Sequence, residues 1–193
     1  MSGAVPAVYD GKIYLFGAGG RPQPSYTVEV YDPETDEWQH VTEMPKMLFN
    51  MTVAVHDNRA YLIGGYDRGK LETNHEVMAY DFETGDWIRD YCDAAPDAAR
   101  GYSYATQTPV VNDRAYLVGG SEPDWADLRL LGSDKFTIFD IKAKSWESGP
   151  ALPEPRNFHL AVVVDNTIYV IGGEDEAETT KDTVFAFRLP GSP

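Results

Sequence analysis

Short apolar runs separated by polar turns recur along the whole chain. In the first quarter they fall at residues 4–9, 12–16, 27–31 and 38–41. Val28 and Val30 alternate with their neighbours, as in a half-buried strand whose successive side chains point to opposite faces. The runs continue at 51–55, 60–63, 76–80, 87–89, 104–111, 115–118, 135–139, 146–147, 159–164, 167–171 and 183–187. The pattern predicts an all-β protein.

One segment recurs in near copies. An apolar run containing a tyrosine leads each time into a glycine pair, at Gly19–Gly20, Gly64–Gly65, Gly119–Gly120 and Gly172–Gly173. Successive pairs are 45, 55 and 53 residues apart, and a period near fifty in a β-rich chain indicates propeller blades. A polar dipeptide such as Asp10-Gly11 or Asp57-Asn58 precedes each run and favours a tight hairpin turn.

An aromatic residue and a tryptophan follow the first three copies at a constant separation of seven residues. The pairs are Tyr31 and Trp38, Tyr80 and Trp87, and Phe139 and Trp146. With the glycine pairs, these residues resemble the kelch-repeat family over nearly the whole chain. The resemblance implies a kelch-type β-propeller, with blades of four antiparallel strands round a channel. We expect the glycines to let strands crowd near the axis, and Trp38, Trp87 and Trp146 to pack between blades.

The repeats predict a single domain of four blades, at about 1–45, 46–95, 96–152 and 153–193. The last blade has three strands, because the chain ends where the family pattern has a tryptophan and a fourth strand. Three arrangements stay open: a four-bladed ring held by packing alone, a half-ring that dimerises into eight blades, or part of a longer propeller. We favour four blades in this chain and leave ring closure open.

Composition narrows the partners. Apolar residues at 42% and a length of 193 residues allow a sizeable core, while the formal net charge of −15 argues against nucleic acid and anionic membranes. A basic peptide or a cation would be attracted, although an acidic surface also serves solubility. Cys92 is the only cysteine, and we see neither a signal peptide nor a membrane span. We expect a cytoplasmic protein.

Candidate chemistry is sparse. The residues after Gly20 cannot open a helix, so no phosphate-binding loop is present. The histidines are isolated in the sequence, at His40, His56, His75 and His159, and we expect neither a metal nor a cofactor. Cys92 adjoins Tyr91 but matches no motif of the kelch-like copper radical oxidases, and no Gly-x-Ser-x-Gly elbow occurs. The acidic run 174–178 is interpreted as a solvated loop.

Loops after the glycine pairs are the candidate binding elements, at residues 21–26, 67–75, 121–134 and 174–182. The resemblance implies ligand contacts at the residue after each pair and where each inner strand opens. Carried over by position, the set is Arg21, Tyr66, Ser121, Glu174, Phe49, Asn50, Arg100, Tyr102, Arg156, Asn157 and Phe158. Trp125, in the longest insertion, is either a partner contact or folded over its blade. For Arg156, packing between blades is the alternative to a ligand contact.

Three functions follow from these observations. The leading hypothesis is a non-enzymatic module that binds a protein or peptide through the loops at the channel mouth. The second is a sugar mutarotase, as some bacterial kelch propellers are, with Arg21, Arg156 and Glu174 at the channel mouth. The third is a structural subunit that forms homo-oligomers through open blade edges, because unpaired strands are templates for association.

Overall fold

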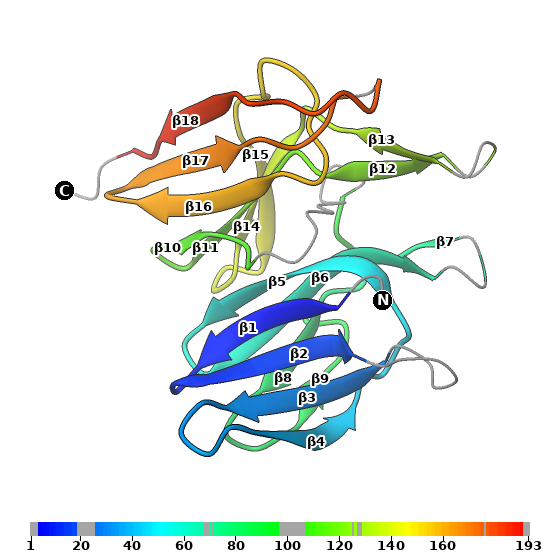
Figure 1. The fold of residues 1–193 in the computed structure, drawn as a ribbon, viewed down its shortest axis with the longest axis vertical. Helices are drawn as coiled ribbons and strands as arrows, with labels where there is room; N and C mark the ends of the chain where they lie inside the picture. The colour runs from blue at the N-terminus through cyan, green and yellow to red at the C-terminus, as the bar shows by residue number, and fades with distance from the viewer. Residues whose placement is uncertain are drawn as a thin grey trace.

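The computed structural model describes residues 4–18, 26–67, 70, 72–96, 107–124, 126, 129–175 and 177–190. All regular elements in these ranges are β-strands, gathered into four antiparallel blades and one further hairpin (Figure 1). Among the same residues, no helix is long and apolar enough to cross a membrane. The predicted all-β propeller with four blades is confirmed.

Blade one contains four strands in chain order: β1 (Val5–Tyr9), β2 (Lys12–Ala18), β3 (Thr27–Asp32) and β4 (Glu37–Glu43). The Asp10-Gly11 turn joins β1 to β2, and both residues have positive φ, at 47° and 72°. Such φ values suit the two-residue hairpin that the sequence predicts.

Blade two has the order β5-β6-β8-β9, built from β5 (Phe49–His56), β6 (Arg59–Asp67), β8 (Met78–Asp81) and β9 (Trp87–Ile88). The short strand β7 (Glu72–Thr73) folds back on the end of β6, so that Tyr66 pairs with Thr73 and Asp67 with Glu72. Part of the segment predicted as a loop therefore extends the blade.

Blade three is formed by β10 (Val110–Val111), β11 (Arg114–Val118), β14 (Phe136–Asp140) and β15 (Ser145–Ser148). Of its predicted first strand, residues 104–106 lie outside the described residues. The insertion expected to be a loop contains a hairpin of β12 (Ser121–Asp124) and β13 (Arg129–Gly132). Its strands pair antiparallel despite Pro123, because these two strands form a sheet of their own, in which every strand is an edge.

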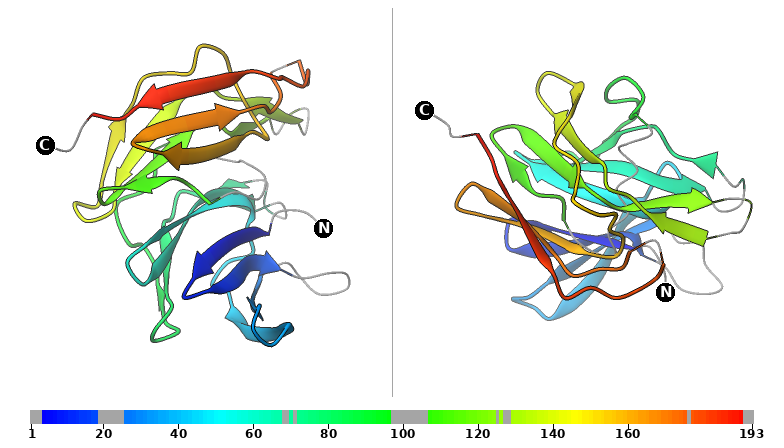
Figure 2. Two further views of the ribbon diagram at one scale, coloured as in Figure 1. Left: turned by 60° about the vertical axis from the view of Figure 1, so that its left-hand side comes forward. Right: turned by 90° about the horizontal axis from the view of Figure 1, so that it is seen from above.

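Blade four has three strands, β16 (Leu160–Val164), β17 (Thr167–Ile171) and β18 (Val184–Arg188), as the sequence predicts. The blades follow one another in an arc, with blades one and two in the lower half of Figure 1 and blades three and four in the upper half. Figure 2 shows the same order from two other sides.

Three apolar clusters hold the arc together, one at each contact between successive blades. Phe16, Leu62 and Tyr80 belong to the first cluster, Tyr61 and Phe139 to the second, and Phe136 and Ile168 to the third. Trp87 packs on the first cluster and Trp146 on the second. Trp38 differs from the expectation that it packs between blades, because it is 55% exposed on blade one.

The first strands of the blades adjoin one another along the axis of the arc. β1 contacts β5, and β10 contacts β5. The amide of Thr108, just before β10, donates to the carbonyl of Val53 at 2.7 Å, and the hydroxyls of Thr52 and Thr108 lie 2.5 Å apart in the interior. These bonds fix blade three against blade two.

Candidate functional site

The glycine pairs end the second strands and bring the chain close to the first strands. Gly65 has φ +82°, and a Cβ there would lie 2.9 Å from the carbonyl oxygen of Phe49 and 3.0 Å from the Cβ of Met51. Gly173 repeats the arrangement, with φ +88° and a Cβ position 2.8 Å from the Cβ of His159. Only glycine combines this backbone angle with such close approach. The pairs serve the packing of the blades.

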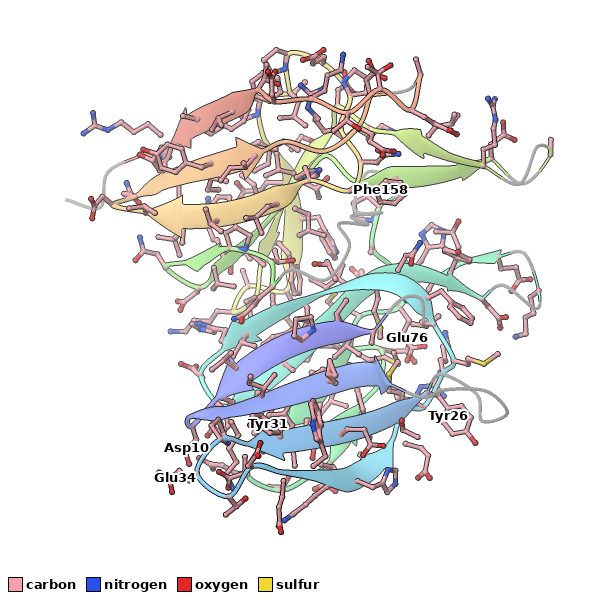
Figure 3. The ribbon with its side chains drawn as sticks, viewed as in Figure 1. Asp10, Tyr26, Tyr31, Glu34, Glu76 and Phe158 are labelled. Carbon is pink, nitrogen blue, oxygen red and sulfur yellow. The ribbon has the colours of Figure 1, made fainter. Side chains whose placement is uncertain are left out.

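We call the end at which the chain leaves the glycine pairs the loop end. The β6–β7 and β12–β13 hairpins both project from it (Figure 1). Figure 3 shows Phe158 and Tyr26 toward this end, whereas Asp10 and Glu34 lie at the opposite end. Residues of different blades thus lie toward the same end of the molecule.

The predicted site residues fall into two groups. Arg21, Arg100, Tyr102 and Trp125, together with Gly19 and Gly20, lie outside the described residues. Tyr66, Ser121, Glu174, Phe49, Asn50, Arg156, Asn157 and Phe158 are described, and the structure gives their surroundings.

On blade two, two of the predicted residues form an aromatic pair. The Phe49 and Tyr66 rings pair across β5 and β6 with their centroids 6.0 Å apart, and both side chains are half-buried. Asn50 is 7% exposed and adopts φ 52°, an angle that asparagine tolerates better than most residues. Tyr66 of this pair also belongs to the projecting β6–β7 hairpin, in which it pairs with Thr73.

On blade four, Asn157 and Glu174 are joined by two backbone hydrogen bonds, of 3.0 and 2.9 Å. Phe158 has φ 51°, a value that is unusual for a bulky side chain and that repeats the angle of Asn50 at the equivalent point of blade two. Ser121 follows the glycine pair of blade three and is fully buried. Phe158 and Glu174 are half-buried, as Phe49 and Tyr66 are on blade two.

Arg156 is fully buried, and its guanidinium is held by its own blade. Nη2 donates to Glu154 Oε1 at 2.5 Å and to Thr183 Oγ1 at 2.6 Å, and the group lies 5.0 Å from the centre of the Phe185 ring. These contacts hold the guanidinium within blade four.

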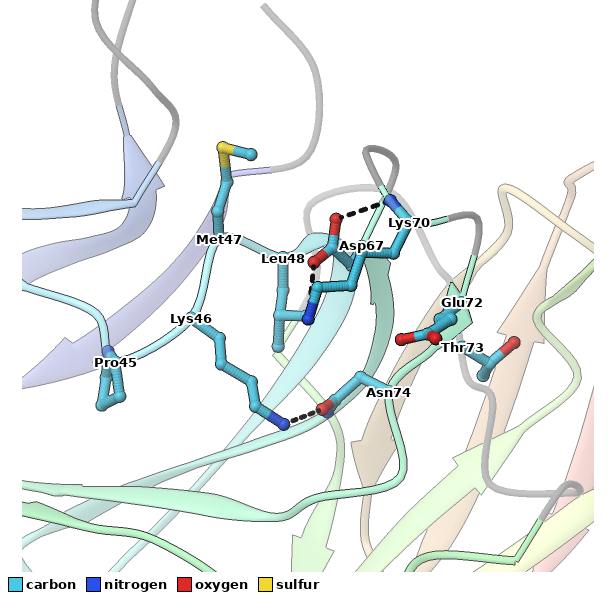
Figure 4. Close-up of a pocket in the computed structure, with 9 residues that line it drawn as sticks. All are labelled: Pro45, Lys46, Met47, Leu48, Asp67, Lys70, Glu72, Thr73 and Asn74. Atoms are coloured by element: carbon cyan, nitrogen blue, oxygen red, sulfur yellow. Dashed lines mark hydrogen bonds and ion pairs between the residues drawn. The ribbon is translucent and has the colours of Figure 1, made fainter.

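A groove lies between the crossing from blade one to blade two and the β6–β7 hairpin (Figure 4). Its volume is about 280 Å³. The lining residues are Pro45, Lys46, Met47, Leu48, Asp67, Lys70, Glu72, Thr73 and Asn74. We refer to this set as the groove. The hairpin side of the groove follows a glycine pair, so the sequence selects it as a candidate binding element. Nothing in the sequence of residues 45–48 predicts that they form the other side.

Leu48 is buried at the groove and Met47 is 37% exposed beside it. Asn74 fixes the hairpin, because its amide nitrogen donates to the carbonyls of Gly64 at 3.0 Å and Glu76 at 2.8 Å. The Lys70 ammonium, 69% exposed, lies 3.9 Å from the Asp67 carboxylate. The exposed Met47 side chain thus lies in a groove whose other exposed side chains include both charges.

The Lys46 side of the groove is held in place by the buried carboxylate of Glu76. Glu76, whose side chain is 6% exposed, lies 2.5 Å from Lys46 Nζ and accepts from Arg89 at 2.8 and 2.9 Å. The hydrogen bonds from Arg89 contribute most, followed by that from Lys46, and together they lower the Glu76 pKa to about 2, although burial acts to raise it. These contacts of Glu76 hold the segment between blades one and two against blade two. The groove is therefore ordered before any ligand binds.

His159 is the histidine most strongly perturbed by its surroundings. Burial, with a smaller contribution from the nearby Arg156 charge, lowers its pKa to about 4. Its Nδ1 is buried without a hydrogen-bond partner in the described part of the chain. Across the described ranges, no three His, Cys, Asp or Glu side chains come together as a cluster that could hold a metal ion.

Comparisons with known proteins agree with this architecture. The model of a family described as the Attractin/LZTR1 beta-propeller matches residues 3–187. Kelch-like protein terF of Aspergillus terreus is 26% identical over 98% of this chain and 39% of its own length. Beta-scruin of Limulus polyphemus is 28% identical, over 94% of this chain and 21% of its own length.

Human kelch repeat and BTB domain-containing protein 12 is 27% identical, over 83% of this chain and 28% of its own length. The chain thus spans between about a fifth and two-fifths of these relatives. Among solved structures, that of YjhT superimposes with a TM-score of 0.72 at 17% identity, covering 95% of this chain and 65% of that one. This likeness concerns the fold.

Proposed function

The chain belongs to the Attractin/LZTR1 β-propeller family and carries kelch repeats, and we propose that it is an interaction module that binds a peptide segment of a protein partner in the groove. A propeller fold hosts many functions, so the proposal rests on the site. The observation that carries it is the ordered groove of about 280 Å³ at the loop end.

The chemistry of the groove suits a short peptide better than a small rigid ligand. Its volume is at the lower limit of about 300 Å³ for small-molecule pockets, which leaves room for one or two side chains of an extended segment. Met47 offers apolar contact, and a methionine adapts its shape readily. Lys70 and Glu72 can orient a charged neighbour of the apolar anchor.

Long-range electrostatics select among peptides. The formal net charge of −15 attracts basic segments and raises their rate of encounter, particularly at low ionic strength. We therefore expect a ligand with one apolar anchor residue flanked by lysine or arginine.

The test is a selection of random peptides displayed on phage against the immobilised protein, followed by titration of the selected peptides in solution. We expect enrichment of basic peptides with an apolar anchor. Met47→Glu should weaken them about tenfold or more, equivalent to about 1.4 kcal/mol, because a carboxylate replaces the apolar contact. Lys70→Glu should change the charge preference next to the anchor.

Lys142→Glu is the matched control. Lys142 is exposed in the turn between β14 and β15, at the end opposite the groove, and its replacement makes the same change of charge as Lys70→Glu. Selected peptides should bind this variant like the wild type. Failure to enrich any peptide, or equal binding to all variants, would contradict the proposed function.

A further inference from the structure

The methionines of the described ranges differ sharply in exposure. Met44, Met51 and Met78 are buried in the first cluster, with exposed fractions of 4%, 0% and 0%. Met47 is 37% exposed and lines the groove. Met1, the remaining methionine of the chain, lies outside the described residues. Among the methionines that the structure describes, an oxidant in solution therefore reaches Met47 first.

The neighbours of Met47 hold it on the open side of its segment. Lys46 lies 2.5 Å from the Glu76 carboxylate and donates to the Asn74 side chain at 3.3 Å, while Leu48 is buried. Figure 4 shows the Lys46 side chain turned toward Asn74 and the Met47 side chain leaving the segment in the opposite direction. The anchored neighbours thus leave the Met47 side chain accessible in an otherwise ordered groove.

A thioether reacts with a peroxide without first losing a proton. The sulfur lone pair attacks one peroxide oxygen, and the S–O bond forms as the O–O bond breaks. Sulfur gives up two electrons, and hydrogen peroxide is reduced to water. The product, methionine sulfoxide, is polar and chiral. Methionine sulfoxide reductases return it to the thioether, with two thiols supplying the electrons and forming a disulfide.

Cys92, the only thiol of the chain, is the competing target for a peroxide. Its side chain is half-buried against the second cluster, and burial raises the pKa of the thiol. Because the thiolate is the reactive form, a raised pKa slows oxidation. Cys92 is not among the residues that line the groove. Its oxidation should therefore be slow and should not act on the groove directly.

We propose that Met47 is a redox modification site, at which a peroxide converts the thioether to the sulfoxide and thereby weakens peptide binding in the groove. The effect on binding rests on the proposed function, in which Met47 is the apolar contact, whereas the selective oxidation does not. A sulfoxide oxygen that faces an apolar anchor loses its water without gaining a hydrogen-bond donor. The reduced groove therefore binds, and the oxidised groove releases.

The first measurement locates the oxidation. The folded protein is treated with a graded series of hydrogen peroxide concentrations, denatured, digested with trypsin and analysed by tandem mass spectrometry. The tryptic peptide 47–59 contains both Met47 and Met51, so it compares an exposed thioether with a buried one. We expect one oxygen on Met47 well before Met51, and equal rates when the protein is unfolded in urea. Equal rates in the folded protein would overturn the proposal.

The second measurement titrates a peptide selected on phage against reduced, oxidised and re-reduced protein. Oxidised wild type should bind it about fivefold more weakly, because a polar group is desolvated. Reduction by methionine sulfoxide reductases for both epimers should restore the affinity. Met47→Leu is the matched variant, since leucine keeps an apolar side chain of similar volume but has no sulfur. It should bind like the reduced wild type, before and after treatment with peroxide.

Two further results would overturn the proposal. One is a loss of binding in peroxide-treated Met47→Leu, and the other is a peroxide response that disappears in Cys92→Ala, which would assign the effect to the thiol. Circular dichroism establishes that the oxidised protein and both variants are folded. The two proposals fail separately. Absence of peptide binding to the reduced protein contradicts the proposed function, whereas equal binding to reduced and oxidised protein contradicts the redox site alone.

Discussion

At the scale of single residues, His159 gives the sharpest expectation. Its pKa is lowered from 6.5 to about 4 in the folded protein, chiefly by burial. The unfolded chain therefore binds more protons than the folded one between these two values. Stability should decrease as the pH falls from 6.5 to 4, by up to about 3 kcal/mol, and this contribution should be constant below pH 4.

The measurement is urea unfolding at a series of pH values for the wild type and His159→Gln. The variant should be less stable near pH 7 but should have a flatter profile between pH 6.5 and 4, since its side chain does not titrate. His40→Gln is the control, because it removes an exposed histidine and leaves the His159 ring in place. An unchanged slope in His159→Gln would show that other groups cause the acid sensitivity.

Residue roles were only partly predictable from the sequence. The position of Tyr66 after a glycine pair places it at the start of the β6–β7 hairpin, where it pairs with Thr73, one of the residues that line the groove. The expectation that ligands contact the residues at which the inner strands open selects Arg156, whose guanidinium binds Glu154 and Thr183 of the same protein. Position in a repeat predicts at which end of a blade a residue lies. Its burial and its hydrogen-bond partners depend on neighbours that are distant in the sequence.

At the scale of elements, two glycines with similar backbone angles allow the cost of a positive φ to be distinguished from the cost of a steric clash. Gly65 and Gly11 have φ +82° and +72°, but a Cβ at Gly65 would meet Phe49 and Met51, whereas nothing lies within 4 Å at Gly11. We expect Gly11→Ala to cost about 1 kcal/mol through its backbone angle alone. Gly65→Ala should cost about 3 kcal/mol, because overpacking is added.

Both values follow from the free energy of unfolding by denaturant, with the slope of the transition as a check on two-state behaviour. Equal losses in the two variants would contradict the view that the glycine pairs exist for the close approach of strands.

Element boundaries show the limits of pattern reading in another way. The apolar periodicity predicts the strands of the blades, including the three-stranded last blade. It does not predict β7 or the β12–β13 hairpin, because residues such as Glu72, Ser121 and Asp124 are polar and add no apolar alternation to the sequence. Backbone pairing at the end of a blade leaves no hydrophobic signal.

At the scale of the whole molecule, the repeat predicts four blades but not the state of the first and last faces. Trp38 carries the same local pattern as Trp87 and Trp146, yet it is 55% exposed, because its cover would have to come from a blade that precedes blade one. A local pattern encodes what a face can bind. Whether a partner is present is a property of the assembly.

The groove likewise arises only at this scale. One side of it comes from the crossing between blades one and two, and the other from the β6–β7 hairpin, while Glu76 joins Lys46 to Arg89 behind it. These parts are separated by up to about forty residues of chain, and only the radial packing of blades brings such parts together.

The central claim, that a peptide binds at the loop end, is tested most directly by amide hydrogen exchange with and without a selected basic peptide. We predict new protection in the segments that contain Met47, Leu48 and Asn74, which line the groove. Protection confined to the turns at the opposite end, Asp57-Asn58 and Asn112-Asp113, would contradict the account.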